Sequence, residues 1–403
     1  MNPLLLSHFT ATTCVGRGLA ANLAALRGER TGLAPCRFET ADLDTCVGEV
    51  AGVDDERLPP ALLDFDCRNN RLAQLGLAQD DFIAAVAVAL ARYGTDRIGV
   101  LVGTSTSGIL QAELAYRQRD AVTGALPDRF RYATTQNLFS VADFVRQTLR
   151  LEGPAVAVSS ACSSSAKVFG AAARMIEAGL IDAAVVGGVD SLCLTTLYGF
   201  SSLQLTSARP CRPFDRDRDG ISIGEAAAFF FIERLPARPA PDDILLLGVG
   251  ESSDAYHMSS PHPEGLGARM AMEQALAGAG LTPGLIDYIN LHGTGTRSND
   301  LAEARAVLSL FGEATRCSST KGTIGHTLGA AGGVEAVISA LALRYGFMPA
   351  GVNTQGLDPA LPLAYLLCND ALAPSRVLSN SFGFGGTNCS LIFGRADGVV
   401  GRA

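Results

Sequence analysis

Cys162 stands at a position where a protein can activate a thiol. In the segment "VSSACSSSAK", a run of small and apolar residues ends at this cysteine, and a helix is predicted to begin directly after it. Unpaired N–H groups and the helix dipole favour an anion at such a place, which lowers the pKa of a thiol and makes a nucleophilic thiolate available. A structural cysteine in a tight turn has the same local sequence, so both interpretations stand at this point.

Two of the five histidines occur in turns of similar composition. His292 lies in "NLHGTGTRSNDLAE" and His326 in "STKGTIGHTLGAAGG". A histidine between glycines at the end of a strand is held by its backbone, which leaves the imidazole free to reach a site. Lys321 and Glu303 accompany these turns, and we expect them to form a buried pair that fixes which imidazole nitrogen carries the proton. Together with Cys162, these residues predict nucleophilic chemistry.

The elements that must position these residues alternate between strands and helices. Continuous apolar runs predict buried strands, and in the first half of the chain they lie at 97–105, 155–161, 182–188 and 228–235. A helix is predicted over 164–179, where Gly179 provides the C-cap. The polar, Pro-rich stretch 236–243 then marks a boundary between two halves.

The second half repeats this order. Strands are predicted at 244–250 and 386–395, and a strand that leads into a Gly turn over 285–296. Helices are predicted at 267–280 and 332–346. The closing stretches "GEAAAFFFIER" and "GTNCSLIFGR" are alike, which indicates an internal duplication. Alternating strands and helices in both halves predict an α/β fold with parallel-rich sheets covered by helices.

Composition argues against several classes of function. The chain of 403 residues is long enough for two cores, and its net charge of −8 disfavours nucleic acid or an anionic membrane as the main partner. The ten cysteines form no CxxC pair and no metal-like spacing with histidine, so we expect reduced thiols and no metal site. The start of the chain has no signal-peptide pattern and no run is long enough to span a bilayer, which predicts a cytoplasmic protein without membrane insertion.

Four segments in matching order resemble the β-ketoacyl-acyl-carrier-protein synthases, the elongating condensing enzymes of the thiolase superfamily. They are "SSACSSSA", "NLHGTGTRSNDLAE", "TKGTIGHTLGAAG" and "NSFGFGGTN", and the similarity runs from about residue 95 to about residue 395. The resemblance implies a duplicated thiolase-like α/β fold of five layers, αβαβα, with one half at 1–239 and the other at 240–403. It also implies a homodimer.

The resemblance further implies a reaction, the decarboxylative Claisen condensation. Cys162 would accept an acyl chain from acyl carrier protein as a thioester, and His292 and His326 would hydrogen-bond the malonyl thioester carbonyl as it becomes an enolate. Lys321 and Glu303 would organise the histidines, as in relatives. No cofactor is implied, because the substrates travel on the phosphopantetheine arm of the carrier. The resemblance also implies that the N–H groups of Cys162 and Phe384 form the oxyanion hole, and that Phe384 is the gate side chain on its Gly-rich loop. Thr294 and Thr296 would bind the pantetheine arm, and Phe200 would line the acyl pocket.

Departures from the family pattern concern the substrate more than the chemistry. Ser163 follows the nucleophile where relatives usually have Ala, and Ile221 stands where relatives have Phe near the malonyl site. Thr106 aligns with a residue that limits chain length in relatives, and an unpaired hydroxyl there is expected to favour short or unsaturated acyl groups. These features predict a dedicated enzyme for aryl-polyene-type or other polyketide-like chains, with fatty-acid elongation as the alternative. Such an enzyme could pair with a chain-length-factor-like subunit that lacks the nucleophile.

A basic patch is expected where the acidic carrier protein docks on this acidic chain. Arg68 and Arg71 lie at i and i+3 on one face of a predicted helix start, and their position resembles the docking pair of relatives. Two solvated surface arginines would have the same spacing, so this interpretation also remains open.

Five other kinds of protein fit the residues less well. A degradative thiolase needs a second catalytic cysteine in a C-terminal Gly-rich motif, whereas Cys389 lies on a predicted strand. Initiating synthases and chalcone-synthase relatives use Cys, His and Asn, and the second histidine argues against both. A chain-length factor lacks the nucleophile that Cys162 supplies, and a Cys-His protease needs neither the lysine nor paired Gly/Thr turns.

Overall fold

The first half of the chain builds a mixed sheet. The structure is a computed structural model that describes residues 1–400, so the last three residues of the predicted half 240–403 lie outside it. The strand order is β1-β9-β7-β5-β6, in which β5 runs parallel to β6 and β7, while β9 runs antiparallel to β1 and β7. The strands are β1 Leu4–Thr13, β5 Ile98–Gly103, β6 Ala155–Val158, β7 Ala183–Asp190 and β9 Ala226–Arg234.

The second half repeats this arrangement strand for strand. Its order is β10-β15-β14-β11-β12, in which β11 runs parallel to β12 and β14, while β15 runs antiparallel to β10 and β14. Its strands are β10 Ile244–Ser253, β11 Tyr288–Asn290, β12 Arg316–Ser318, β14 Arg376–Gly383 and β15 Thr387–Arg395, with β13 Ala364–Tyr365 at the edge. The pairs Leu4↔Leu246 and Leu5↔Leu245 join β1 to β10 and make the half-sheets continuous. The repeated order confirms the predicted duplication.

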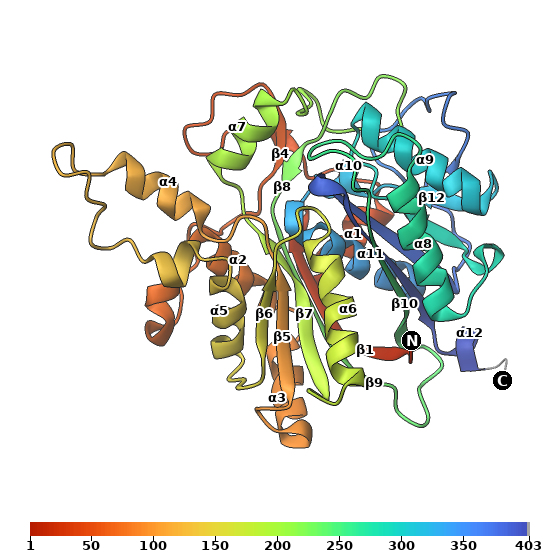
Figure 1. Ribbon diagram of the computed structural model, residues 1–403, viewed down its shortest axis with the longest axis horizontal. Helices are drawn as coiled ribbons and strands as arrows, with labels where there is room; N and C mark the ends of the chain where they lie inside the picture. The colour runs from red at the N-terminus through yellow and green to blue at the C-terminus, as the bar shows by residue number, and fades with distance from the viewer. Residues whose placement is uncertain (401–403) are drawn as a thin grey trace.

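Two helices lie between the half-sheets. α6 (Ser164–Glu177) packs against β5 and β7 of the first half and β10 and β15 of the second, and α11 (Ala331–Tyr345) likewise contacts strands of both. The outer face of the first half-sheet is covered by α2 (Arg68–Leu77), α3 (Phe82–Tyr93) and α5 (Ser140–Thr148), and that of the second by α8 (Leu266–Ala279) with α9 (Arg297–Phe311) beside it (Figure 1). These layers are the predicted αβαβα arrangement.

The central helices approach each other closely because small residues face the contact. A Cβ atom on Gly332 of α11 would lie 2.7 Å from the Cβ of Ala166 on α6. Leu328–Tyr345, which contains α11, is the one unbroken helical stretch of the described residues that is long and apolar enough to cross a membrane, and 89% of it is buried inside the protein. Its apolar composition therefore fits its place in the core.

The structure confirms the predicted strand that leads into a glycine turn over 285–296. The strand is β11, which spans Tyr288–Asn290. Beyond it Gly293 and Gly295 adopt φ values of +33° and +83°, and the N–H groups of His292 and Gly293 donate to the Glu303 side chain instead of a neighbouring strand. The chain thus leaves the sheet at the point where it presents His292.

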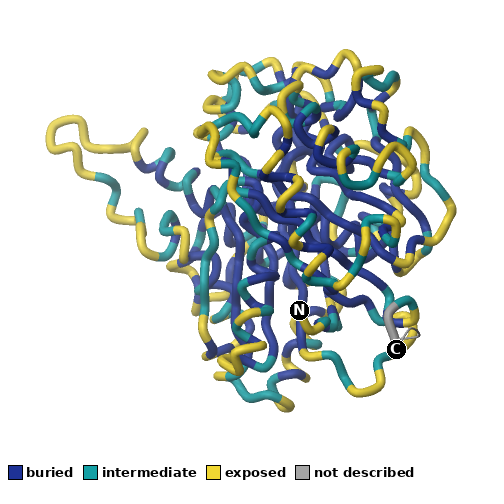
Figure 2. The backbone as a smooth tube through the Cα atoms, turned by 45° about the vertical axis from the view of Figure 1, so that its right-hand side comes forward, coloured by how far each residue is buried: buried dark blue, intermediate teal, exposed yellow. Residues whose placement is uncertain are grey.

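An arm projects from the first half. It consists of α4 (Ile109–Arg117) and the loop after it, which extend away from the body in Figure 1; the loop is largely exposed in Figure 2. Tyr116, Val122 and Tyr132 on this arm are 59%, 94% and 60% exposed. Apolar side chains gathered on a projecting segment are typical of an interaction surface.

Candidate active site

Cys162 occupies a sharp turn between β6 and α6. Ala161, directly before it, has φ +51°, a left-handed conformation that strains a residue with a Cβ atom. Ser164 Oγ donates to the carbonyl oxygen of Ala161 at 2.6 Å and stabilises the turn. The Cys162 residue is buried at 6% exposure, yet it lines a cavity.

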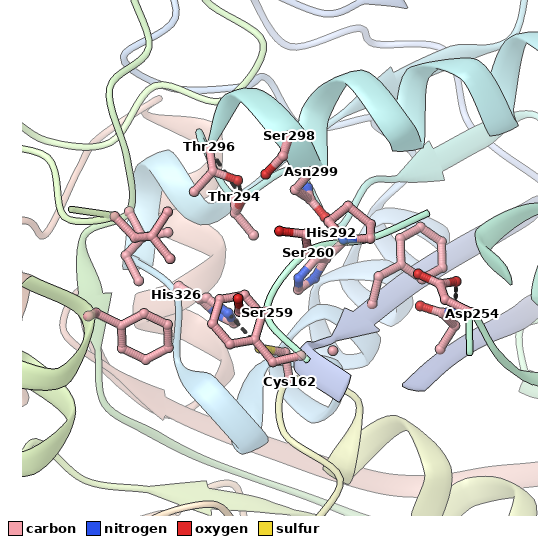
Figure 3. A pocket seen from close by; sticks show the side chains of 18 residues that line it. Cys162, Asp254, Ser259, Ser260, His292, Thr294, Thr296, Ser298, Asn299 and His326 are labelled. Carbon is pink, nitrogen blue, oxygen red and sulfur yellow. Dashed lines mark hydrogen bonds between the residues drawn. The ribbon is translucent and has the colours of Figure 1, made fainter. Parts of the chain in front are cut away.

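His326 lies just before the turn of the second half that matches the Cys162 turn. Leu328 has φ +52° and stands three residues before α11, as Ala161 stands three residues before α6. His326 Nε2 lies 3.0 Å from Cys162 Sγ (Figure 3). Within the described residues, His326 Nδ1 has no hydrogen-bond partner, so the surroundings impose neither tautomer. Nε2 can therefore accept the thiol proton or donate to a substrate oxygen.

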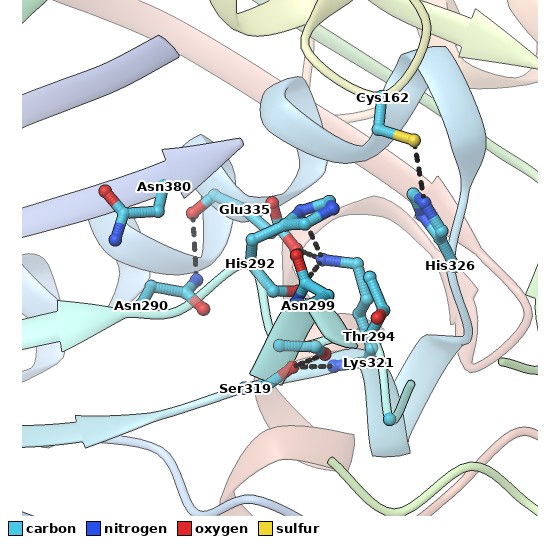
Figure 4. A network of polar contacts seen from close by, with 12 residues as sticks. Cys162, Asn290, His292, Thr294, Asn299, Ser319, Lys321, His326, Glu335 and Asn380 are labelled. Carbon is cyan, nitrogen blue, oxygen red and sulfur yellow. Dashed lines mark hydrogen bonds and ion pairs between the residues drawn. The ribbon is translucent and has the colours of Figure 1, made fainter. Parts of the chain in front are cut away.

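The imidazole of His292 is fixed by a lysine. Lys321 Nζ lies 3.3 Å from His292 Nδ1, donates to the His292 carbonyl oxygen, and forms a buried ion pair with Glu335 of α11 (Figure 4). An ammonium group has no acceptor site, so Nδ1 must accept and the proton of the neutral imidazole sits on Nε2. The predicted Lys321–Glu303 pair is wrong, because α11 brings Glu335 to the lysine.

Glu303 acts on the backbone of the His292 turn. Its two carboxylate oxygens accept the N–H groups of His292 at 2.8 Å and Gly293 at 2.7 Å, and Asn380 Nδ2 donates to it at 3.1 Å. Burial raises the pKa of Glu303 to about 7, against the lowering effect of these donors. Glu303 therefore holds the turn that presents the histidine.

Burial dominates the electrostatics of the three reactive groups. It raises the pKa of the Cys162 thiol to about 11, while Lys321 and the backbone N–H of Phe384 act in the opposite direction. The expected depressed thiol pKa is wrong, because enclosure outweighs the helix dipole. Burial, reinforced by the charge of Lys321, also holds the pKa values of His292 and His326 well below the usual range, so both imidazoles are neutral near pH 7.

The cavity beside the nucleophile brings together the residues expected to bind substrate. It has a volume of about 50 Å³ and is lined by Thr294, Thr296, Phe200, Ile221 and Phe384 among others. The hydroxyl oxygens of the two threonines lie 2.9 Å apart. The rings of Phe200 and Phe384 lie 5.6 Å apart between centroids, so the side chain expected to act as the gate contacts the aromatic residue expected in the acyl pocket.

The reactive cluster has the elements of a soft metal site. Cys162 Sγ and one ring nitrogen each of His292 and His326 all lie within 4.8 Å of one another, a donor set that zinc accepts. A metal on His292 would face the nearby charge of Lys321, which repels a cation. The arrangement therefore suits a polarised or anionic oxygen better than a metal ion.

Thr106 does not line this cavity. Its fully buried hydroxyl donates to Asp190 Oδ1 at 2.8 Å and accepts the N–H of Ser191 at 3.2 Å. The prediction of an unpaired hydroxyl facing the acyl chain is wrong, because the carboxylate at the end of β7 takes it. Thr106 thus gives no support for a preference for short or unsaturated acyl groups.

Arg68 and Arg71 are not free to dock a partner. Arg68 is 2% exposed, and its guanidinium donates to Glu225 at 2.6 Å and 3.0 Å and to Asp54 at 2.7 Å. Arg71 is 19% exposed and forms a bidentate pair with Asp66. The predicted docking pair is therefore wrong: Glu225 and Asp54 from other segments engage the buried Arg68, and Asp66, just before α2, pairs with the partly buried Arg71.

Some residues of the site were not found from the sequence. Glu335 could have been found, because it is an isolated acidic residue in the apolar stretch "GGVEAVISALALRYG". Asp254 lines the cavity, accepts Asn388 Nδ2 at 2.9 Å and donates its N–H to the carbonyl oxygen of Gly386 in the gate loop. Its segment is a polar loop, and only the fold brings that loop to the site.

Comparison with known proteins agrees with this geometry. The model of the β-ketoacyl synthase N-terminal domain matches residues 65–237, and that of the C-terminal domain matches residues 245–355. A 3-oxoacyl-[acyl-carrier-protein] synthase 2 from Rhizobium meliloti (strain 1021) is 38% identical over 342 residues, which cover 78% of this chain and 80% of the relative. Another from Synechocystis sp. is 32% identical over 95% of each chain.

A solved structure shows the same fold over nearly the whole chain. One chain of a ketosynthase in complex with its chain length factor, from Xenorhabdus doucetiae, superposes with a TM-score of 0.88 and is 40% identical, with 98% of both chains covered. Identity at this level over full length, with both domain models in register, establishes kinship beyond the shape of the fold. The chain is an enzyme of the β-ketoacyl synthase family.

Proposed function

We propose that the chain condenses a malonyl group with an acyl chain, both carried by acyl carrier protein. In the first step Cys162 Sγ attacks the acyl thioester, and its proton passes to His326 Nε2, 3.0 Å away. His326 then gives this proton to the departing pantetheine sulfur. The N–H groups of Cys162 and Phe384 stabilise the tetrahedral oxyanion of this transfer.

In the second step a malonyl thioester enters the same cavity. His292 donates to its thioester carbonyl from Nε2, and His326 does so once its proton has moved from Nδ1 to Nε2, a tautomer change that the unpartnered Nδ1 allows. The electrons of the breaking C–CO₂ bond form an enolate as CO₂ leaves. The enolate carbon attacks the acyl carbonyl on Cys162, the bond from that carbon to sulfur breaks, and the departing thiolate takes up one proton from solvent. The product is a 3-oxoacyl group two carbons longer on the carrier.

The contact between Cys162 Sγ and His326 Nε2, beside a His292 tautomer fixed by Lys321, carries this proposal. The names of the relatives from Rhizobium and Synechocystis support it. Mixing the chain with acyl and malonyl carrier proteins should give a 3-oxoacyl carrier detectable by mass spectrometry. Cys162→Ala should abolish the product, whereas Cys368→Ala, at an exposed cysteine, should not. Product formation by Cys162→Ala would contradict the mechanism.

A second candidate is the specialised form of the same reaction, in which the chain works beside a nucleophile-free subunit on aryl-polyene-type or other polyketide-like chains. The likeness to a ketosynthase solved with its chain length factor supports this candidate. A panel of carrier-bound primers, short saturated, long saturated, polyunsaturated and aryl, separates the two. Turnover of long saturated primers alone would assign the chain to fatty-acid synthesis.

The arm and the edge strand β6 are the surfaces that we assign to a dimer partner. β6 ends the sheet with an unpaired edge, and Val122 on the arm is 94% exposed. Val122→Asp should convert a dimer into a monomer in light scattering after size exclusion, whereas Val88→Asp, at a 74% exposed valine on α3, should not. A purified chain that is already monomeric would favour a heterodimer with a sister subunit.

A further inference from the structure

Ser163 places a hydroxyl group where it connects two parts of the site. Its side chain is fully buried, and Oγ donates to the Ser160 carbonyl oxygen at 2.9 Å. Two other hydroxyl oxygens lie near it, Ser160 Oγ at 3.1 Å and Thr387 Oγ1 at 3.4 Å. A hydroxyl has one proton and two lone pairs, so Ser163 can donate to the carbonyl and accept from both neighbours.

Thr387 stands at the base of the gate. It pairs with Gly383 across the β14–β15 hairpin, whose tip Phe384–Gly386 carries the gate side chain. A Cβ atom on Gly383 would lie 3.0 Å from the Ser160 carbonyl oxygen, so the hairpin base packs directly on the nucleophile turn. The positive φ values of Gly385 and Gly386, +80° and +73°, give the tip conformations that glycine adopts without strain.

The hairpin is held on two sides. On one side the N–H of Gly385 donates to the Met258 carbonyl oxygen at 2.7 Å, and the N–H of Asp254 donates to the Gly386 carbonyl oxygen at 2.8 Å. On the other side the Thr387 hydroxyl faces Ser163, the residue next to the nucleophile. A movement of the hairpin base away from the nucleophile turn would break this second contact.

We propose that Ser163 is a positioning residue that latches the gate hairpin to the nucleophile turn through Thr387, and thereby sets how often Cys162 becomes accessible to an acyl donor. The proposal rests on the proposed acyl-transfer function. An alanine at this position would fill the space without an acceptor for Thr387.

The experiment compares Ser163→Ala, Thr387→Val and the double variant. Losing one hydrogen bond of this kind should raise the open population about threefold. Hydrogen exchange at the amides of residues 383–387 should accelerate by that factor in each variant, and no further in the double variant, because exchange reports the open population. Thr387→Ser, which keeps the hydroxyl, should restore the slow exchange, and Ser159→Ala, at an exposed serine of the same turn, should have no effect.

Activity gives a second, independent measurement. Loading of Cys162 with bulky acyl groups should accelerate about threefold in Ser163→Ala, while malonyl decarboxylation stays unchanged. A merely structural serine would lower both rates together. Unchanged exchange in Ser163→Ala, or additive effects in the double variant, would overturn the latch. Faster exchange in a protein that never acylates Cys162 would keep the latch and refute the proposed function instead.

Discussion

Replacing His326 by Ala should slow the loading of Cys162 far more than replacing His292. The structure separates the two histidines, because His326 Nε2 lies 3.0 Å from the nucleophilic sulfur, whereas His292 is held by Lys321 with its Nε2 proton ready for an oxygen. Only His326 is therefore placed to receive the thiol proton.

The size of the effect follows from the thiol. With a pKa of about 11, Cys162 ionises near pH 7.5 at a cost of about 5 kcal/mol. A positioned general base contributes a factor of about 10² to 10⁴, and this is the loss expected in His326→Ala. Loading by that variant should then rise about tenfold per pH unit, because it depends on free thiolate. His292→Ala should load at nearly the wild-type rate.

Decarboxylation gives the complementary pattern, since both imidazoles donate to the malonyl carbonyl. Each variant should lose a factor of about 10² to 10³ in this step. Loading is measured in single turnovers with an acyl carrier protein by intact-protein mass spectrometry, and decarboxylation by loss of the malonyl carrier. His257→Ala, at an exposed histidine, is the control. Wild-type loading by His326→Ala near neutral pH, or a rate that does not rise with pH, would refute the reasoning.

Two further variants test the network around the site. Lys321→Met frees His292 Nδ1 and should lower decarboxylation about 10- to 100-fold, as followed by the same two assays. It should also slow loading, because Lys321 lowers the pKa of the Cys162 thiol. Arg68→Met leaves Glu225 buried without its partner and should lower the free energy of unfolding in urea by about 3–5 kcal/mol. Arg71→Met should cost less than about 1 kcal/mol, because its partner Asp66 is partly solvated. Equal losses for the two arginines would contradict the burial described here.

The sequence could predict the features that depend on local residue patterns. Apolar runs and glycine stops locate the strands and helices of both halves, and the likeness of their endings indicates the duplication. Cys162 and the two histidines were recognisable because each stands in a short turn motif; Cys162 and His292 follow strands, and His326 follows the short helix α10 (Lys321–Ile324). Local patterns of this kind survive folding, since the backbone of the turn itself sets where the side chain begins.

The features that the sequence could not give depend on what packs against a residue. Lys321 has a carboxylate on either side in sequence, and only the path of α11 selects Glu335 over Glu303. The start of α2 reads as an exposed basic pair, but Glu225 from another segment encloses Arg68. The helix dipole predicts a lowered thiol pKa at Cys162, but burial reverses the sign. In each case residues distant in sequence provide the contact or the burial that determines the observed partner or pKa.

The duplication also shows why one half, and not both, presents a nucleophile. In each half a residue with positive φ, Ala161 or Leu328, is followed by a residue that lies two positions before a central helix. In the second half that residue is Gly329, whose N–H donates to Asp190 at the end of β7. A Cβ atom on Gly329 would lie 2.7 Å from the Asp190 carboxylate, so a cysteine has no room there.

The first half has the opposite arrangement at the equivalent place. Repeated strand order makes β14 the counterpart of β7, and the residue at the end of β14 is Gly383, which carries no side chain. No carboxylate therefore fills the space beside Cys162, and the N–H of Phe384 faces the thiol instead. In the second half the N–H of Gly329 donates to the buried Asp190 carboxylate at all times. In the first half the N–H of Cys162 stays available for an oxyanion that forms only during the reaction. The exchange of Asp190 for Gly383 at matching strand ends thus separates the turn that stabilises the fold from the turn that performs the chemistry.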